Sequence, residues 1–248
     1  MDGALAFFAV VPGLAIGSFL NVVAARLPER RSIVWPPSAC PSCATEIAWY
    51  DNVPVLSYLL LRGRCRACSA RIGLVYPAVE LTTAALLAGC LVAFGLSLRA
   101  AGAAVFCAAL VVVSATDLTH RIVPNRVVLP AAVVVLALMT AAEPSPEWAI
   151  AAFGASAFLL VAALAYPGGM GMGDVKLAFL MGAALGRTVT VALLLGMIAA
   201  LVPSIILFAR HGARARKMAI PLAPFLALGS VVALFAGHAL IHGYLALV

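Results

Sequence analysis

The sequence predicts an all-α, polytopic membrane protein with about eight transmembrane helices and a small cytoplasmic zinc-binding domain between the first and second helices. Three observations lead to this prediction. Hydrophobic residues make up 65% of the 248 residues and charged residues only 10%, whereas soluble domains are about 25% charged. The apolar residues form runs long enough to cross a bilayer. The basic residues lie in the short segments between those runs.

The distribution of charge indicates a membrane topology. A net charge of +7 would suit a nucleic-acid partner, but the charges are spread over loops between apolar runs. With about eight spans and both termini outside, every Lys and Arg except Arg99 and Arg187 falls on the cytoplasmic side, as the positive-inside rule requires. We therefore expect the lipid bilayer, and no nucleic acid, as a partner.

Residues 1–25 are predicted to form the first transmembrane helix. The run lacks the basic start of a cleaved signal, because Met1 is followed by Asp2. Near its inner end, the segment from Gly17 to Val23 places Ser18 and Asn21 among apolar residues. Packing between helices through small and polar residues explains this segment about as well as a functional role does.

Residues 26–75 are predicted to form a cytoplasmic zinc-binding domain. Cys40-Pro41-Ser42-Cys43 and Cys65-Arg66-Ala67-Cys68 are two C-x2-C pairs separated by 21 residues. Two such pairs can supply a closed tetrahedral site, which suits structural zinc. Two disulfides are the alternative, which a reducing cytoplasm disfavours. A segment of this size builds little core, so bound metal would supply folding free energy.

Other features of the amino-terminal half have less specific interpretations. The aromatic stretch 49–58 between the cysteine pairs fits either the membrane surface or packing within the small domain. Cys90 and Cys107 lie singly in apolar runs and are expected to be buried hydrophobic residues. Glu80 lies inside the second span, where an acid is expected to pair with an arginine or to line a site.

Residues 76–248 are predicted to form a second, transmembrane domain. The second span covers residues 74–97, the third ends at Asp117, and Pro124 breaks the chain before the fourth. The run from Val175 to Gly186 is too short to cross a bilayer as a helix, so we expect a thinned or protein-lined surrounding. The remaining predicted spans are 101–117, 126–142, a fifth ending near Tyr166, 188–209 and 220–246.

A glycine-rich stretch, Gly168-Gly169-Met170-Gly171-Met172-Gly173-Asp174-Val175-Lys176, lies between two of these apolar runs. An acid at the mouth of a membrane helix indicates a functional site. Asp117 is its counterpart at the end of another run, and both are predicted at the same, cytoplasmic, depth. Lys176 is expected either to tune the pair or, more simply, to anchor the helix at the membrane surface.

Two neighbouring carboxyl groups cannot easily both ionise, so one remains protonated while the other acts as a base. Such a pair can activate water and protonate a leaving amide, and the glycines would let an extended peptide approach. An ion-coupled transporter that uses the aspartates as a proton relay is the main alternative. A zinc-bearing scaffold of a secretion machine, without chemistry, is another.

The chain resembles the bacterial prepilin peptidases, which belong to the GxGD class of membrane aspartic proteases. The stretch Gly171-Met172-Gly173-Asp174-Val175-Lys176-Leu177 matches the GxGDxKL motif, and Asp117 with Ile122-Val123-Pro124-Asn125 resembles the first aspartate motif. The amino-terminal region is similar in segments 17–22, 26–28, 51–58 and 76–80 and in both cysteine pairs. The chain departs from the family pattern at residues 221–225 and 73–75.

The resemblance implies cleavage of a short basic leader from type IV prepilins or type II secretion pseudopilins at the cytoplasmic side of the bacterial inner membrane. It implies Asp117 and Asp174 as the catalytic pair, supported by Gly171, Gly173 and Lys176. Cys40, Cys43, Cys65 and Cys68 would be the zinc ligands. The resemblance also implies methylation of the new amino terminus with S-adenosylmethionine, whose binding residues are not identified by any motif here.

Overall fold

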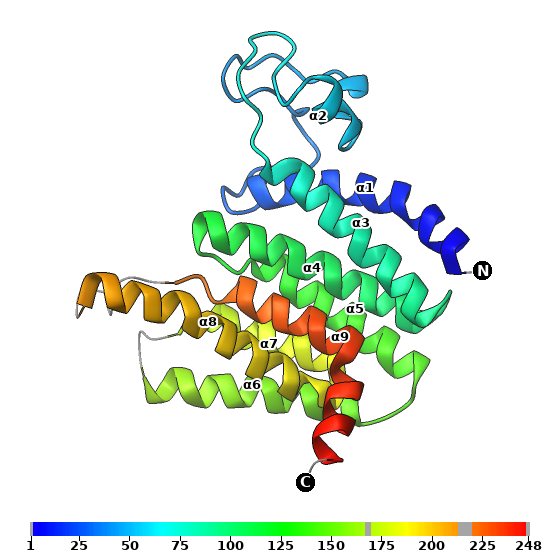
Figure 1. The fold of residues 1–248 in the computed structure, drawn as a ribbon, viewed down its shortest axis with the longest axis vertical. Helices are drawn as coiled ribbons and strands as arrows, with labels where there is room; N and C mark the ends of the chain where they lie inside the picture. Colours follow the sequence, from blue (N-terminus) through cyan, green and yellow to red (C-terminus); the bar gives the residue numbers. More distant parts are fainter. Residues whose placement is uncertain (1, 167–169, 213–219, 247–248) are drawn as a thin grey trace. The chain divides into compact units, whose positions relative to one another are not determined.

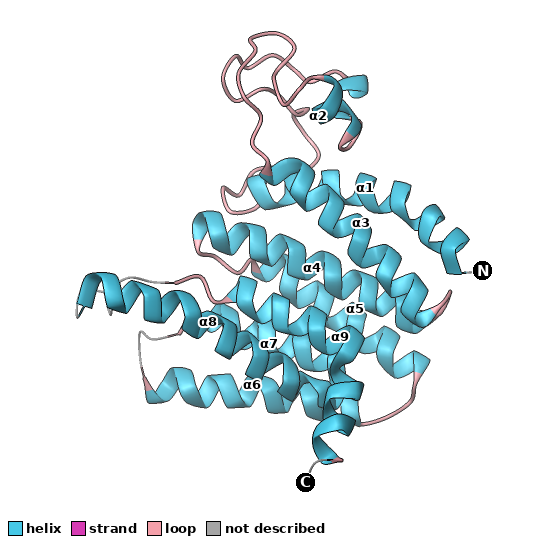
Figure 2. Ribbon diagram, in the orientation of Figure 1, coloured by secondary structure: helices cyan, strands magenta, loops and turns pink. Residues whose placement is uncertain are grey.

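The computed structural model describes residues 2–166, 170–212 and 220–246. The chain divides into two compact units, unit 1 (Met1–Leu96) and unit 2 (Ser97–Val248). Helices dominate both units (Figures 1 and 2). The prediction of an all-α fold is confirmed. The described residues contain two isolated β-bridges, and none of them forms a β-strand.

In unit 1, helices α1 (Asp2–Arg26) and α3 (Val75–Phe94) lie side by side (Figure 1). Gly13 and Gly17 allow this contact. A Cβ atom at Gly13 would lie 2.7 Å from the Cα of Ala84, and one at Gly17 would lie 2.6 Å from the Cα of Glu80. The two glycines have the GxxxG spacing of close helix pairs, so the small residues of the first span do pack helices.

The segment between α1 and α3 is mostly loop, with the short helices η1 (Trp49–Asn52) and α2 (Leu56–Leu60) (Figure 2). Each cysteine pair forms a similar turn. The backbone N–H of Cys40 donates to the carbonyl of Thr45, and that of Cys65 donates to the carbonyl of Ala70. One isolated β-bridge accompanies each turn. The two turns are therefore near-repeats of one local structure.

Unit 2 is a helical bundle around a short central helix. It contains α4 (Leu98–His120), α5 (Asn125–Ala142), α6 (Glu147–Ala165), α7 (Met172–Leu185), η2 (Gly186–Thr188), α8 (Val189–His211) and α9 (Ala223–Leu245). Helix α7 contacts α4, α5, α6, α8 and α9. Most of its residues are buried. The short apolar run is therefore surrounded by protein, which removes the need for it to span the hydrocarbon core alone.

Seven candidate membrane spans are present in the described residues, and the protein is a multi-pass membrane protein. The predicted sixth and seventh spans lie in one continuous apolar stretch, Met172–His211. Gly186, with a φ of +55°, ends α7 and separates it from α8. Large apolar side chains on the outer faces of the bundle are exposed, including Val133, Ile150 and Ile205, as lipid-facing residues would be.

The division into units does not follow the predicted boundary between residues 75 and 76. Packing places α3 with α1, and unit 2 begins at Ser97, whose side chain accepts from the Ala100 N–H and caps α4. The reason is the glycine-mediated contact between α1 and α3 described above. Charge and hydropathy patterns identify spans but do not reveal which spans pack together.

Candidate active site and metal centre

Asp117 lies in the last turn of α4 and is buried. Its Oδ2 atom accepts a hydrogen bond of 3.0 Å from the backbone N–H of Ala223, at the first residue of α9. Helix α4 ends at Arg121, which has a left-handed backbone conformation and donates its N–H to the carbonyl of Asp117. The carboxyl group is therefore positioned by the end of one helix and the beginning of another.

Asp174 lies in the first turn of α7, which begins after the N-cap residue Gly171. Its N–H donates to the Gly171 carbonyl at 3.1 Å, and a carboxylate here is favoured by the positive end of the helix dipole. The carboxyl groups of Asp174 and Asp117 lie close enough to interact electrostatically. The fold thus brings together two acids that are far apart in the sequence.

Gly173 permits the close approach of the two aspartate motifs. A Cβ atom at this position would lie 2.7 Å from the Cβ of Val123, in the loop that follows α4. Real side chains do not tolerate such a distance, so any larger residue would separate the start of α7 from that loop. Gly171 is exposed and extended, and its built Cβ position meets no close neighbour except Asp174 Oδ2 at 3.7 Å.

Lys176 joins the same two motifs. Its Nζ atom donates to Oδ1 of Asn125 at 3.0 Å, which connects α7 with the start of α5. That Lys176 tunes the acids or anchors the helix at the membrane surface stays a prediction, and this hydrogen bond adds a contact with another part of the protein. Lys176 and Asn125 therefore hold the ends of α7 and α5 together beside the two acids.

Two contacts at this site were not predicted from the sequence. One is the Ala223 N–H, and the other is Val123 against Gly173. A backbone amide has no side-chain signature, although Pro224 next to Ala223 does indicate a helix start there. Gly168 and Gly169 of the predicted stretch lie outside the described residues, as do Arg214, Arg216 and Lys217 of the predicted basic loop.

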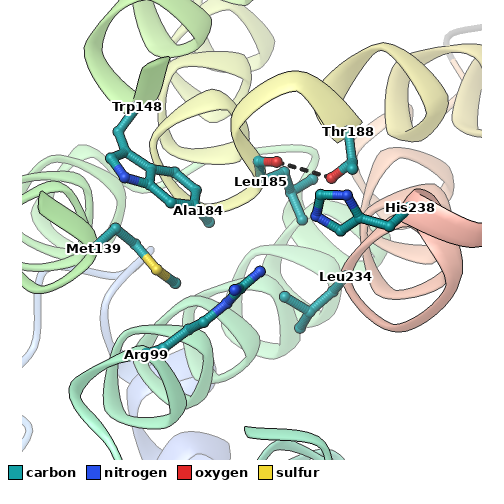
Figure 3. Close-up of a pocket in the computed structure, with 8 residues that line it drawn as sticks. All are labelled: Arg99, Met139, Trp148, Ala184, Leu185, Thr188, Leu234 and His238. Atoms are coloured by element: carbon teal, nitrogen blue, oxygen red, sulfur yellow. Dashed lines mark hydrogen bonds between the residues drawn. The ribbon is translucent and has the colours of Figure 1, made fainter. Parts of the chain in front are cut away.

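The other end of the unit 2 bundle is closed. Arg99, Met139, Trp148 and His238 surround a pocket of only about 10 Å³ (Figure 3), which is room for about one water molecule. Glu147 and Arg187 form an ion pair at the same end, with 2.8 Å between Oε2 and Nη2. Arg99 and Asp117 are 18 residues apart on α4, or about 27 Å along the helix, so this pocket lies far from the acids.

The four cysteines of the two C-x2-C pairs form one cluster in unit 1. Their Sγ atoms all lie within 4.8 Å of one another, and Cys40 and Cys68 are 3.8 Å apart. Zn–S bonds of about 2.3 Å in a tetrahedron place sulfur atoms roughly 3.8 Å apart. The predicted ligands therefore have the spacing that a tetrahedral zinc ion requires.

The thiol acidities also suit a bound cation. Side-chain and backbone hydrogen bonds with Thr45 lower the pKa of Cys43 to about 6. For Cys68, the hydrogen bond with the Ala70 backbone favours the thiolate, but interaction with Cys43 and burial outweigh it and raise the pKa to about 11. Four adjacent thiolates repel one another, and a divalent cation removes that repulsion. The donor set and geometry fit structural zinc.

Glu80 has a different partner from those expected. Its Oε2 atom accepts from the backbone N–H of Val55 at 2.8 Å. The residue is buried and lines a cavity in unit 1, which agrees with the second of the two expectations. No Lys or Arg among the described residues forms an ion pair with it.

Comparisons with known proteins cover nearly the whole chain. Residues 11–94 match the model of the bacterial peptidase A24 N-terminal domain, and residues 104–205 match that of the type IV leader peptidase family. No solved structure matches. The prepilin leader peptidase/N-methyltransferase of Bacillus subtilis (strain 168) is 35% identical over 246 residues, covering 94% of this chain and 95% of the relative.

Two further relatives carry the same name. The protein of Burkholderia pseudomallei (strain 1026b) is 36% identical over 267 residues, covering 93% of this chain and 85% of the relative. That of Pseudomonas aeruginosa is 32% identical over 271 residues, covering 95% and 92%. Identity of this extent across both halves confirms the resemblance that the aspartate and cysteine motifs indicated. The chain belongs to the type IV leader peptidase family and is a peptidase.

Proposed function

We propose that this peptidase is an aspartic endopeptidase that removes the short basic leader from type IV prepilins or pseudopilins, with Asp117 and Asp174 as its catalytic pair. The observation that carries the proposal is that these two carboxyl groups, in the last turn of α4 and the first turn of α7, lie close enough to interact electrostatically. The pair lies within the segment that matches the type IV leader peptidase family.

The two acids divide the work of hydrolysis. One carboxylate takes a proton from a water molecule as that water attacks the scissile carbonyl carbon, and the other, protonated, donates to the substrate. The Ala223 N–H fixes one oxygen of Asp117 and leaves the other for water or substrate. The Val123–Gly173 contact and the Lys176–Asn125 hydrogen bond keep the two helix ends in place.

The glycine-rich entry to α7 provides a surface for an extended peptide. Gly171 has extended backbone angles, φ −82° and ψ 147°, and is exposed. Without a side chain, it lets a substrate strand approach the backbone beside Asp174 and form main-chain hydrogen bonds. Gly173 contributes differently, through the close packing described above.

The proposed orientation places the acids at the cytoplasmic side of the inner membrane. The charge distribution supports it, since Arg99 and Arg187 lie at the end of unit 2 opposite the acids and the other basic residues fall on the acids' side in the predicted topology. The names of the relatives support a second reaction, methylation of the new amino terminus with S-adenosylmethionine. The cysteine cluster would hold structural zinc, with no step of either reaction at the metal.

The test is cleavage of a prepilin with a basic leader by purified, full-length protein and its Asp117→Asn and Asp174→Asn variants. Glu143→Gln, at an exposed carboxyl beyond the end of α5, is the matched control. We expect each Asp→Asn change to reduce the cleavage rate by about 10²–10⁴-fold, with the control unchanged. Cleavage at the wild-type rate by either variant would show that the pair is wrongly identified, and an inactive wild type would favour the transporter or scaffold alternatives.

A further inference from the structure

A large cavity lies in unit 1, between the inner end of α1, the loops of residues 26–74 and the start of α3. Its volume is about 970 Å³, within the range of pockets that bind small molecules and cofactors. Aromatic and polar side chains line it, among them Tyr50, Asn52, Tyr58 and Tyr76. Hydrolysis by Asp117 and Asp174, in the other unit, gives this cavity no role.

Glu80 is the buried acid of this cavity, with 8% of its surface exposed. Two other acids of the lining are neutralised by neighbours. Asp51 forms two hydrogen bonds of 2.6 and 2.7 Å with Arg66, and Glu29 pairs with Arg31 at 3.2 Å. Among the described residues, Glu80 receives only the Val55 N–H and an interaction with the Ser18 hydroxyl. A buried carboxylate of this kind is suited to bind a cation that comes from outside the chain.

The backbone around Val55 is strained to reach Glu80. Val55 has a φ of +59° and a ψ of −48°, and Leu56 donates its N–H to the carbonyl of Pro54. These features define a classic γ-turn, which is rare and strained, and a β-branched residue with positive φ is a true outlier. Ser57 holds the turn, accepting from the Val53 N–H and donating to the Tyr50 carbonyl. Such maintained strain commonly marks a functional site.

The opposite side of Glu80 is fixed by α1. Gly17 allows α1 to lie against the Cα of Glu80, and Asn21 donates from Nδ2 to the carbonyl of Tyr76 at 3.0 Å. The carboxyl group is therefore held by two helices and a strained turn and faces a cavity. Catalytic residues are typically held in place by surrounding contacts in this way. A charged residue that serves only stability does not require such positioning.

We propose that Glu80 is the residue of this cavity that binds the α-amino group of the newly cut pilin during methyl transfer and accepts its proton. The inference rests on the methylation included in the proposed function. The amino nitrogen, once deprotonated by Glu80, forms a bond to the methyl carbon of the sulfonium donor. The C–S bond breaks with its electron pair remaining on sulfur, and the proton passes from Glu80 to solvent. The donor is S-adenosylmethionine, and its product is the neutral thioether.

The position of Glu80 suits binding of the pilin amino group better than binding of the nucleoside part of S-adenosylmethionine. Glu80 is the sixth residue of a candidate membrane span, Val75–Phe94. Asp117 and Asp174 also lie at the ends of membrane helices, so the cut chain begins near the membrane edge. The loop-lined part of the cavity offers Tyr50 and Asn52, an aromatic ring and an amide that suit a purine and its ribose.

The experiment compares wild type, Glu80→Gln and Glu143→Gln, the last being an exposed acid outside the cavity lining, beyond the end of α5. Full-length protein receives an already cleaved pilin with a free amino terminus and S-adenosylmethionine, and methylation is followed by mass spectrometry. Binding of S-adenosylhomocysteine is measured separately by calorimetry. We expect Glu80→Gln to reduce methylation by about 100-fold, with the affinity for S-adenosylhomocysteine changed by less than about threefold. Glu143→Gln should resemble wild type.

A Glu80→Asp variant distinguishes a chemical role of the carboxyl group from a structural one. It retains a carboxyl group and should therefore recover part of the methylation that Glu80→Gln loses. Methylation by Glu80→Gln close to wild type would overturn the inference, as would loss of S-adenosylhomocysteine binding in both Glu80 variants. Equal rates in Glu80→Asp and Glu80→Gln would overturn it as well. Failure of wild type to methylate or to bind S-adenosylhomocysteine would instead refute the proposed methylation itself.

Discussion

The two units hold their acidic groups by different means. In unit 2, Asp117 and Asp174 are positioned by the ends of packed helices, one Ala223 amide and the absence of a side chain at Gly173. In unit 1, Glu80 is positioned by a helix pair together with a strained loop, in a segment that carries a cysteine cluster. Unit 2 therefore depends on helix packing, whereas unit 1 also depends on a loop segment whose four cysteines could hold a metal ion.

This difference implies that substitutions can impair one of the two sites without impairing the other. Damage to helix contacts should abolish cleavage, and damage to the cysteine cluster should affect the chemistry of unit 1 first.

Gly173→Ala is expected to have the largest effect. The added methyl group would meet Val123 at 2.7 Å and push the start of α7 away from the loop after α4. A displacement of about 1 Å at a catalytic group costs roughly 100-fold in rate, and we expect that loss in cleavage. Gly154→Ala is the control, since nothing lies within 4 Å of its Cβ position. Val123→Gly, which removes the Cβ atom that the added methyl group would meet, should restore part of the activity of Gly173→Ala. Failure of both the loss and the rescue would refute the packing role.

Cys40→Ser is expected to remove bound zinc and open the segment between α1 and α3. Loss of one of four ligands weakens metal binding and with it the folding of a small domain. We expect methylation to decrease about 10–100-fold, with a smaller change in cleavage. Zinc content and limited proteolysis measure the effect, and Cys90→Ala, outside the cluster, is the control. A Cys40→Ser protein that keeps its zinc and its resistance to protease would show that the cluster is not a zinc site.

Removal of the Lys176–Asn125 hydrogen bond should have a moderate effect on cleavage. The bond is partly exposed and is worth about 1 kcal/mol, or roughly fivefold in rate if it is fully expressed in the transition state. A double-mutant cycle compares Lys176→Met, Asn125→Ala and the variant that carries both changes. The cleavage rate of the double variant should be no lower than that of the slower single variant. Arg126→Gln, an exposed neighbouring cation, is the control. Additive losses would mean that the two residues act independently.

Asp51→Asn should have the smallest effect, because Arg66, its partner in the ion pair, is exposed to solvent, which screens the charge interaction. The hydrogen bonds from Arg66 lower the pKa of Asp51, so the pair stabilises the fold above the ordinary carboxyl pKa, about 3.9. This contribution is lost as the pH falls through the lower, folded-state pKa. Thermal unfolding should show a slight difference from wild type at neutral pH that vanishes in acid. A difference that grows in acid would contradict this assignment.

The sequence predicted most of the helices and the two motifs because hydropathy and cysteine spacing are local signals. Contacts that arise only on folding could not be predicted, such as the amide of Ala223 against Asp117 or Val123 against Gly173. Glu80 illustrates the limit well. Its burial in a span suggested a role, but its partner is a strained backbone N–H, which no composition or spacing rule reveals.

The central claim is that the aspartate pair of unit 2 performs cleavage and nothing else. The most direct test gives Asp117→Asn and Asp174→Asn two substrates in parallel, an intact prepilin and an already cleaved pilin with S-adenosylmethionine. Both variants should leave the prepilin uncut while methylating the cleaved pilin at the wild-type rate. Cleavage of the prepilin at the wild-type rate by either variant would contradict the claim, and so would loss of methylation together with cleavage in a protein that remains folded.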